Sequence, residues 1–174
     1  MNCDECAIML GSAACRVWVE KGARAIAIEK DKQNKRYTLL LGVTCTGVFV
    51  GRLIEGSCTS LIYSDFIKYI ANRMGTVKYV LSADNCSIHR THFARYVANQ
   101  TDTTTLYTLA YYPEGCAIEL VFSILKCRCD EYVIEDKSDL LYSIETILKD
   151  LPKTYFGSIF DHARKIAVKD GLSY

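Results

Sequence analysis

The sequence predicts a single mixed α/β domain with strands and helices interleaved. Its 174 residues are half hydrophobic and 24% charged, which suits one globular domain. Runs rich in β-formers come first, strands then alternate with amphipathic segments, and the chain ends in helical patterns. No linker, internal repeat or low-complexity segment divides it. We therefore expect one domain over residues 1–174, with a helical C-terminal part from about residue 138.

The first half predicts strands followed by a helix. RYTLLLGVT and GVFVGRLIEG are rich in β-formers and flank a turn at Thr46-Gly47, which predicts a hairpin. Thr59 or Ser60 can cap a helix that runs to about Met74, where Gly75 ends it. Shorter apolar runs suggest further strand fragments at 6–10, 16–20 and 24–29.

The second half alternates strands and helices. VKYVLSA and TTTLYTLA are expected strands with a short helix at about 91–100 between them, an order that implies a right-handed parallel crossover. After a loop at Tyr111–Gly115, CAIELVFSILKCRC carries an apolar stripe at helical spacing. Two more helices are expected at 139–149 and 153–169, interrupted at Leu151-Pro152.

Composition excludes several classes of protein. Lysine and arginine number 21 against 20 acidic residues, so no broad basic surface marks a nucleic-acid partner. No apolar run reaches the ~20 residues of a membrane span, and the N-terminus does not resemble a signal peptide. We expect no membrane association and an intracellular location, where the nine cysteines are mostly reduced thiols and the glycosylation patterns at Asn85 and Asn99 are chance matches.

The segment VLSADNCSIH, residues 80–89, raises a question about function. An apolar strand ends abruptly in Asp84-Asn85, and His89 follows five positions after the aspartate. Functional groups of open α/β sheets gather at the carboxyl ends of strands, where Asp84 is expected. The alternative is an Asp-Asn turn or helix cap without further function.

Two further carboxylates favour a functional site. Asp4, followed by Glu5, lies where the first strand region begins, and Glu119 lies in the first turn of a helix, at the inward face or edge of its apolar stripe. Buried carboxylates are costly unless a cation is near. Mg²⁺ takes oxygen ligands, and two such ions ~4 Å apart can support phosphodiester chemistry. Three converging acids therefore suggest a divalent-metal site.

These residues resemble those of a known family. VLSADNCSIHRT is similar to the second-aspartate motif, D-N-x-x-x-H, of the mariner-like DDE transposases, and LAYYPEGCAIELVFSILK resembles their third-acid motif. The 34 residues between Asp84 and Glu119 match the spacing of this branch. Asp4-Glu5 and VWVEKG resemble the family's first-strand D-E and its W-x-x-x-G element.

The resemblance implies an RNase H-like fold, a mixed sheet flanked by helices, with Asp4, Asp84 and Glu119 as catalytic and metal-binding triad. It implies Mg²⁺ or Mn²⁺, two ions, as cofactor and DNA as partner. It further implies cutting of DNA and joining of 3′-ends to a target, action as a homodimer, and nuclear location in a eukaryote. His89 and Asn85 are expected to support Asp84.

The sequence also departs from the family pattern. Cys116-Ala117 stands where the family has Asn-Pro, and loss of that proline predicts looser placement of Glu119. The family's N-terminal helix-turn-helix region has no counterpart here, which suggests an excised, truncated or domesticated catalytic domain. An alternative function is therefore a degenerate, non-catalytic DNA- or protein-binding scaffold.

Other side chains leave alternatives open. Cys3-x-x-Cys6 and Cys127-x-Cys129 could form a four-cysteine zinc site, although free thiols are the simpler interpretation. His89 could equally begin a helix and bond to backbone. The remaining basic candidates could touch a DNA backbone or form a solvated face, namely Lys35, Arg36, Arg90, Arg95, Lys126 and Arg128.

Overall fold

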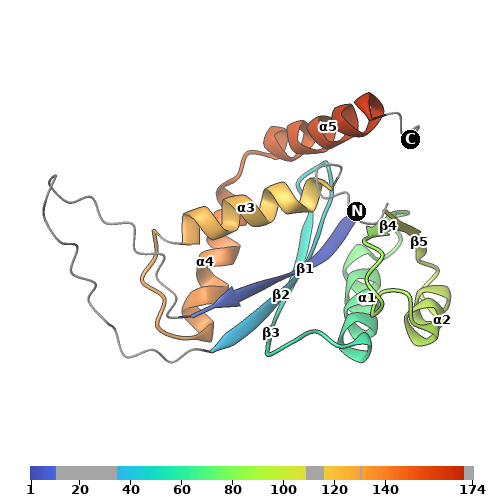
Figure 1. Cartoon of the computed structure of the whole chain (residues 1–174), viewed down its shortest axis with the longest axis horizontal. Helices are drawn as coiled ribbons and strands as arrows, with labels where there is room; N and C mark the ends of the chain where they lie inside the picture. The colour runs from blue at the N-terminus through green and yellow to red at the C-terminus, as the bar shows by residue number, and fades with distance from the viewer. Residues whose placement is uncertain (11–34, 109–115, 130, 171–174) are drawn as a thin grey trace, which may run out of the picture.

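A five-stranded mixed sheet forms the centre of the part of the chain that the computed structural model describes, which is residues 1–10, 35–108, 116–129 and 131–170 (Figure 1). The strands are β1 (Asn2–Met9), β2 (Arg36–Val43), β3 (Phe49–Glu55), β4 (Val80–Ala83) and β5 (Thr104–Tyr107). The helices are α1 (Ser60–Met74), α2 (His92–Gln100), α3 (Ala117–Cys129), α4 (Lys137–Asp150) and α5 (Lys153–Lys169).

The strand order is β3-β2-β1-β4-β5. β1, β2 and β3 pair antiparallel, as the predicted hairpin requires, and β1, β4 and β5 run parallel. The β4–α2–β5 unit is therefore the expected parallel crossover. β1 lies at the centre and pairs with an antiparallel neighbour on one side and a parallel neighbour on the other. This central position makes β1 the strand on which a site can be built.

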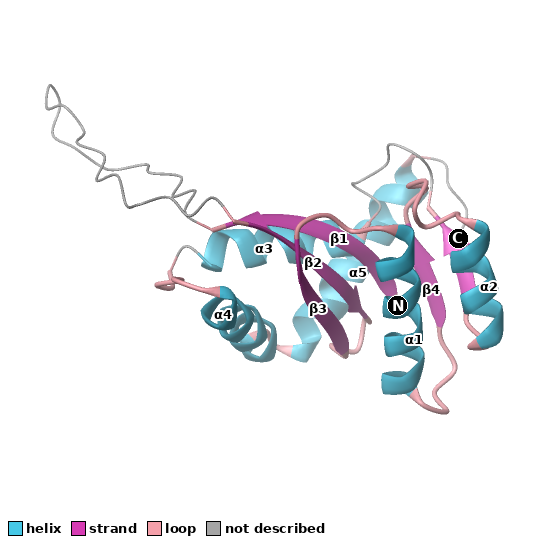
Figure 2. Cartoon of the chain, turned by 90° about the horizontal axis from the view of Figure 1, so that it is seen from below, coloured by secondary structure: helices cyan, strands magenta, loops and turns pink. Residues whose placement is uncertain are grey.

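Both faces of the sheet are covered by helices. Alternate residues of β2 enter two different cores, because side chains of a strand point to opposite faces in turn. Leu39 and Leu41 pack with α3, α4 and α5, whereas Leu40 packs with α1 and α2. Figure 2 shows α1 against one face of the sheet and α3, α4 and α5 on the other. Continuous apolar runs such as that of β2 follow from this two-sided burial.

Local sequence signals place the helix ends. The Thr59 side chain accepts a hydrogen bond from the Ile62 N–H at the start of α1, and Gly75, with φ of 57°, ends this helix. Thr91 caps α2 in the same way, by accepting from the Ala94 N–H. α4 begins with a capping box formed by Asp136 and Asp139. Each cap satisfies an amide at a helix end that has no partner within its own helix.

The structure differs from the sequence-based expectation at the first strand. We expected this strand at residues 6–10, but β1 begins at Asn2 and all eight of its residues pair with β2. Pairing on both sides therefore overrides the low strand preference of Asn and Asp. The expected fragments at 16–20 and 24–29, VWVEKG, and the loop at 111–115 lie outside the described residues. Within the described residues, no helix is long and apolar enough to cross a membrane.

Candidate active site

The register of two parallel strands brings Asp4 and Asp84 together. Asn2 of β1 lies opposite Ser82 of β4. Two residues further along each strand stand Asp4, within β1, and Asp84, directly after β4. The expected position of Asp84 at the carboxyl end of a strand is therefore what the structure shows.

The start of α3 is tied to the same part of β1. The buried side chain of Asn2 accepts a hydrogen bond from the Ile118 N–H at 2.9 Å. Because Glu119 is the next residue of the helix, this bond holds the third acid near Asp4. Glu119 is exposed rather than turned inward along the apolar stripe, so it faces solvent beside the site. The expected looseness from the missing proline is opposed by a tether that the family motif does not reveal.

Replacing Asn2 tests this tether. We expect Asn2→Ala to lower the free energy of unfolding by about 1–3 kcal/mol, because the buried Ile118 amide loses its acceptor. Asn72→Ala, at an exposed position of α1, should change it by less than about 0.5 kcal/mol. Urea unfolding of the wild type and both variants measures the difference. Equal effects of the two substitutions would contradict the tether.

Among the acids of the site, Asp4 has a strongly raised pKa. Burial, together with the charges of the Glu5, Asp84 and Glu119 carboxylates, raises the pKa of Asp4 to about 7 against the opposing hydrogen bond from the Glu5 N–H. That bond is 2.8 Å long. Asp84 and Glu119 are thus close enough to Asp4 to repel its charge. Carboxylates that are partly buried and repel one another favour a bound cation.

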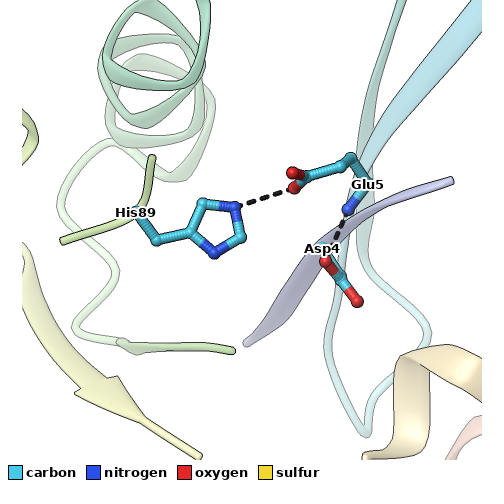
Figure 3. A group of neighbouring side chains, drawn as sticks. All are labelled: Asp4, Glu5 and His89. Carbon is cyan, nitrogen blue, oxygen red and sulfur yellow. Dashed lines mark hydrogen bonds and ion pairs between the residues drawn. The ribbon is translucent and has the colours of Figure 1, made fainter. Parts of the chain in front are cut away.

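His89 lies behind this cluster and bridges two acids. Its Nε2 lies 2.7 Å from Glu5 Oε2, and its Nδ1 lies 2.6 Å from Asp84 Oδ1. The His89 side chain is 0% exposed. Figure 3 shows the Glu5 carboxylate directed at the imidazole while the Asp4 carboxylate points elsewhere. His89 therefore contacts Asp84 directly, and its contact with Glu5 was not expected.

The two carboxylates set the charge of His89. Burial lowers the pKa of His89, but hydrogen bonds to Asp84 and Glu5 and their negative charges outweigh it and raise the pKa to about 10. In return, the hydrogen bond from His89 lowers the pKa of Asp84 in spite of partial burial. At neutral pH the bridge is therefore an imidazolium between two carboxylates, which needs both ring nitrogens as donors.

The segment after β4 is held by further contacts. The Asn85 side chain donates to the Thr108 carbonyl at 2.5 Å, which connects this segment to the residue after β5. The Cys86 N–H donates to Asp84 Oδ1 at 2.8 Å, and the Tyr107 hydroxyl donates to the His89 carbonyl at 3.0 Å. Asn85 thus lies where it can support the Asp84 loop, as expected, rather than contribute to the acidic cluster.

The donor set fits a hard divalent cation. Asp4, Asp84 and Glu119 offer carboxylate oxygens, the ligand type that Mg²⁺ and Mn²⁺ prefer. Ligand atoms of Asp4, Glu5 and His89 also lie within 4.8 Å of one another. Both His89 nitrogens already contact carboxylates, however, so His89 has no lone pair left for a metal. Asp4, Asp84 and Glu119 are the ligands that the sequence predicts, but among the described residues they do not form a group of ligand atoms within 4.8 Å of one another.

A zinc site that uses both Cys3 and Cys6 is wrong for this structure. The two cysteines are three positions apart on β1 and point to opposite faces of the sheet. Cys3 packs with α1 and α2, whereas Cys6 packs with α3, α4 and α5. One ion cannot reach both thiols. Both are buried in apolar surroundings, which raises the pKa of each thiol and favours the reduced, neutral form.

Sequence analysis missed the roles of Asn2 and Glu5. Nothing in the local pattern of β1 links Asn2 to a helix 116 positions away. For Glu5 the signal lies in its position next to Asp4, since adjacent residues of a strand point to opposite faces and cannot share one face of a site. Alternation alone therefore predicts that Glu5 needs a partner behind the sheet.

Solved structures define the class of this fold as RNase H-like. The Mos1 mariner paired-end complex with Mn matches 99% of this chain with a TM-score of 0.79 at 14% identity, and the pre-cleavage Mos1 transpososome matches with 0.80 at 12%. The catalytic domain of Mos1 mariner transposase matches with 0.73 at 13%. This chain covers 56% of the chain in the paired-end complex and 82% of that catalytic domain.

Sequence comparison then identifies the family. Residues 1–141 match the model of the DDE superfamily endonucleases, and the chain belongs to this family. No curated protein matched in a sequence search. The expected mixed α/β sheet of RNase H-like type and the expected DDE family are thereby both confirmed.

Proposed function

We propose that this domain performs divalent-metal-dependent cleavage of DNA strands and transfer of their 3′-ends, with Asp4, Asp84 and Glu119 as the catalytic metal-binding triad. The observation that carries the proposal is that Asp84 and Glu119 lie near enough to Asp4 for their charges to raise its pKa. β1, the end of β4 and the start of α3 are tied together by strand register and by the Asn2–Ile118 bond. The raised pKa of Asp4, caused by burial and by the neighbouring carboxylates, supports a site adapted to a cation.

The residues of the chain have separate tasks in this proposal. Asp4, Asp84 and Glu119 supply oxygen ligands for two Mg²⁺ or Mn²⁺ ions, and His89 and Asn85 keep the Asp84 segment in place. Such ions, when bound, activate a water or a 3′-hydroxyl and stabilise the leaving oxygen. The partial burial of Asp4 limits water at the cluster, which strengthens its interaction with positive charge.

DNA is the partner that the comparisons favour. The similar structures are described as paired-end and strand-transfer complexes and as a transpososome of the Mos1 transposase. Crystals of that protein with Mn and with Mg support a divalent cation for this chain as well. We further propose action as a dimer on paired DNA ends, which those paired-end complexes suggest.

A metal titration of the wild type and Asp84→Asn tests the proposal. A ligand that binds only the folded state at 100 times its Kd adds about 2.7 kcal/mol to the free energy of unfolding. We expect Mn²⁺ to raise the Tm of the wild type and of Asp161→Asn, an exposed control on α5, but not that of Asp84→Asn. Nicking of supercoiled DNA should follow the same pattern and stop with EDTA.

The same experiment separates the alternative function. A non-catalytic scaffold predicts normal folding and DNA binding in the wild type and Asp84→Asn alike, without metal stabilisation and without nicking. Stabilisation of the wild type by Mn²⁺ that persists fully in Asp84→Asn would place the cation elsewhere and contradict the triad.

A further inference from the structure

Two neighbouring acids of β1 are separated by the sheet itself. Asp4 lies on the face that packs against α3, together with Asn2, which bonds to the start of that helix. Glu5 points to the opposite face, where α1 and α2 pack, and its carboxylate is 20% exposed. The triad proposed above uses Asp4 and gives Glu5 no task. A carboxylate behind a site of three other carboxylates adds repulsion unless a cation compensates it.

His89 is the residue that meets Glu5, with its Nε2 2.7 Å from Glu5 Oε2. Its ring is fully buried and lies 4.2 Å from the Tyr63 ring, measured between centroids. Its backbone is held at both ends, because the His89 N–H donates to the Cys86 carbonyl at 3.1 Å and its carbonyl accepts from Tyr107. The position of the His89 backbone is therefore restrained, and the orientation of its buried ring is left to the contacts with Tyr63, Glu5 and Asp84.

Among the described residues, the ion pair from His89 and the hydrogen bond from Cys86 meet the same oxygen of the Asp84 carboxylate. His89 Nδ1 and the Cys86 N–H meet Oδ1 at 2.6 and 2.8 Å. The Asp84 side chain is 45% exposed, so its other oxygen, Oδ2, is the one left to face an ion. The orientation of this ligand depends on its contact with His89, and the His89 ring is held from its other nitrogen by Glu5.

We propose that Glu5 is a positioning residue, which fixes the metal-facing orientation of Asp84 through the buried His89 bridge. This role rests on the proposed function, since it concerns the same site. In this proposal Asp4 supplies a metal ligand on one face of β1, and the adjacent Glu5 positions a second ligand, Asp84, from the other face. Partners of ligating groups commonly alter metal affinity 10- to 100-fold when they are replaced.

Glu5→Gln removes the charge of Glu5 and retains its size. We expect its Kd for Mn²⁺, measured by calorimetry, to rise about 10- to 100-fold. A lower metal-free Tm is also expected, because the buried His89 ring loses one of its two carboxylate partners. Glu55→Gln at the exposed end of β3 is the matched control and should bind Mn²⁺ as the wild type does. Glu5→Asp is a second variant, for the case that Glu5→Gln does not fold. It keeps the charge, but its side chain is one methylene too short for the 2.7 Å contact with His89 Nε2.

A double variant shows whether Glu5 acts through His89. If it does, Glu5→Gln combined with His89→Gln should weaken Mn²⁺ binding no more than His89→Gln alone, because residues acting in series are not additive. If the losses of Mn²⁺ affinity in the two single variants add up in the double variant, Glu5 does not act through His89. Its effect on the metal would then be a direct electrostatic one, and the inference would be overturned.

The remaining outcomes are also distinct. Unchanged Mn²⁺ affinity in Glu5→Gln or Glu5→Asp, with or without a lower Tm, would give Glu5 a structural role only and overturn the inference while the triad stands. Absence of Mn²⁺ binding in the wild type would overturn the proposed metal site and the role of Glu5 with it.

Discussion

Asp4→Asn is expected to stabilise the metal-free domain while removing its response to metal. The pKa of Asp4 is about 7 in the folded protein, raised by burial from an ordinary value of 3.8. Folding therefore favours the protonated carboxyl. This stabilisation is complete below pH 3.8 and is lost as the pH rises through about 7. At pH 8 the wild type carries a partly buried charge that asparagine does not have.

The size of this effect follows from the pKa difference. One pKa unit corresponds to about 1.4 kcal/mol, so at pH 8 in EDTA we expect Asp4→Asn to unfold with a free energy about 2–4 kcal/mol higher than the wild type. Asparagine can still accept the hydrogen bond that the Glu5 N–H donates to Asp4 Oδ1. The gain should shrink towards pH 4, where the wild-type carboxyl is protonated.

Denaturant unfolding at pH 4 and pH 8, with EDTA and with Mn²⁺, measures both parts of this prediction. Asp65→Asn, an exposed aspartate of α1 that pairs with Lys68, serves as control and should be neutral at both pH values. A less stable Asp4→Asn at pH 8 in EDTA would show that the Asp4 charge is already compensated without metal. Full Mn²⁺ stabilisation of the variant would exclude Asp4 as a ligand.

His89→Ala is expected to lower the free energy of unfolding by about 3–5 kcal/mol. Removal of the imidazolium leaves the partly buried carboxylates of Glu5 and Asp84 without their positively charged partner. The bridge also predicts a pH dependence. Since the pKa of His89 is raised from 6.5 to about 10, its contribution is complete below pH 6.5 and is lost as the pH rises through about 10. Since the pKa of Asp84 is lowered from 3.8, the contribution is also lost in acid.

The difference in unfolding free energy between wild type and His89→Ala should therefore be largest between about pH 4 and pH 6.5. Urea unfolding across this range and up to pH 10 measures it, with His162→Ala on the exposed side of α5 as control. A difference that stays constant from pH 6.5 to pH 10 would show that His89 is neutral and bonds to only one acid as a donor.

Local patterns were sufficient for most of the fold. The hairpin of β2 and β3, the α1 helix between Thr59 and Gly75, and the β4–α2–β5 crossover all follow from β-rich runs, caps and turn residues that act over a few positions. The extent of β1 could not be predicted in this way. Asn2 and Asp4 are poor strand formers, and only pairing with residues about 40 positions away makes them part of a strand.

The candidate site also has features that local sequence predicts and features that depend on distant contacts. The residue types and spacing around Asp84 and Glu119 predicted an acidic cluster because each motif is contiguous in sequence. For Glu119 the sequence left open the inward face or the edge of the apolar stripe, and the structure places it at the exposed edge. The restraint on α3 was missed because it comes from Asn2, on a distant strand.

The sequence by itself determined which elements form, which acids stand at their ends and to which family the chain belongs. Only the tertiary structure decided how those acids are held. The register of β1 against β4 sets Asp4 beside Asp84, Asn2 ties down the helix of Glu119, and Glu5 reaches His89 from the opposite face of the sheet. The physical reason is range: helix caps and strand preferences act between near neighbours in sequence, whereas hydrogen bonds between buried charges depend on where separate elements pack.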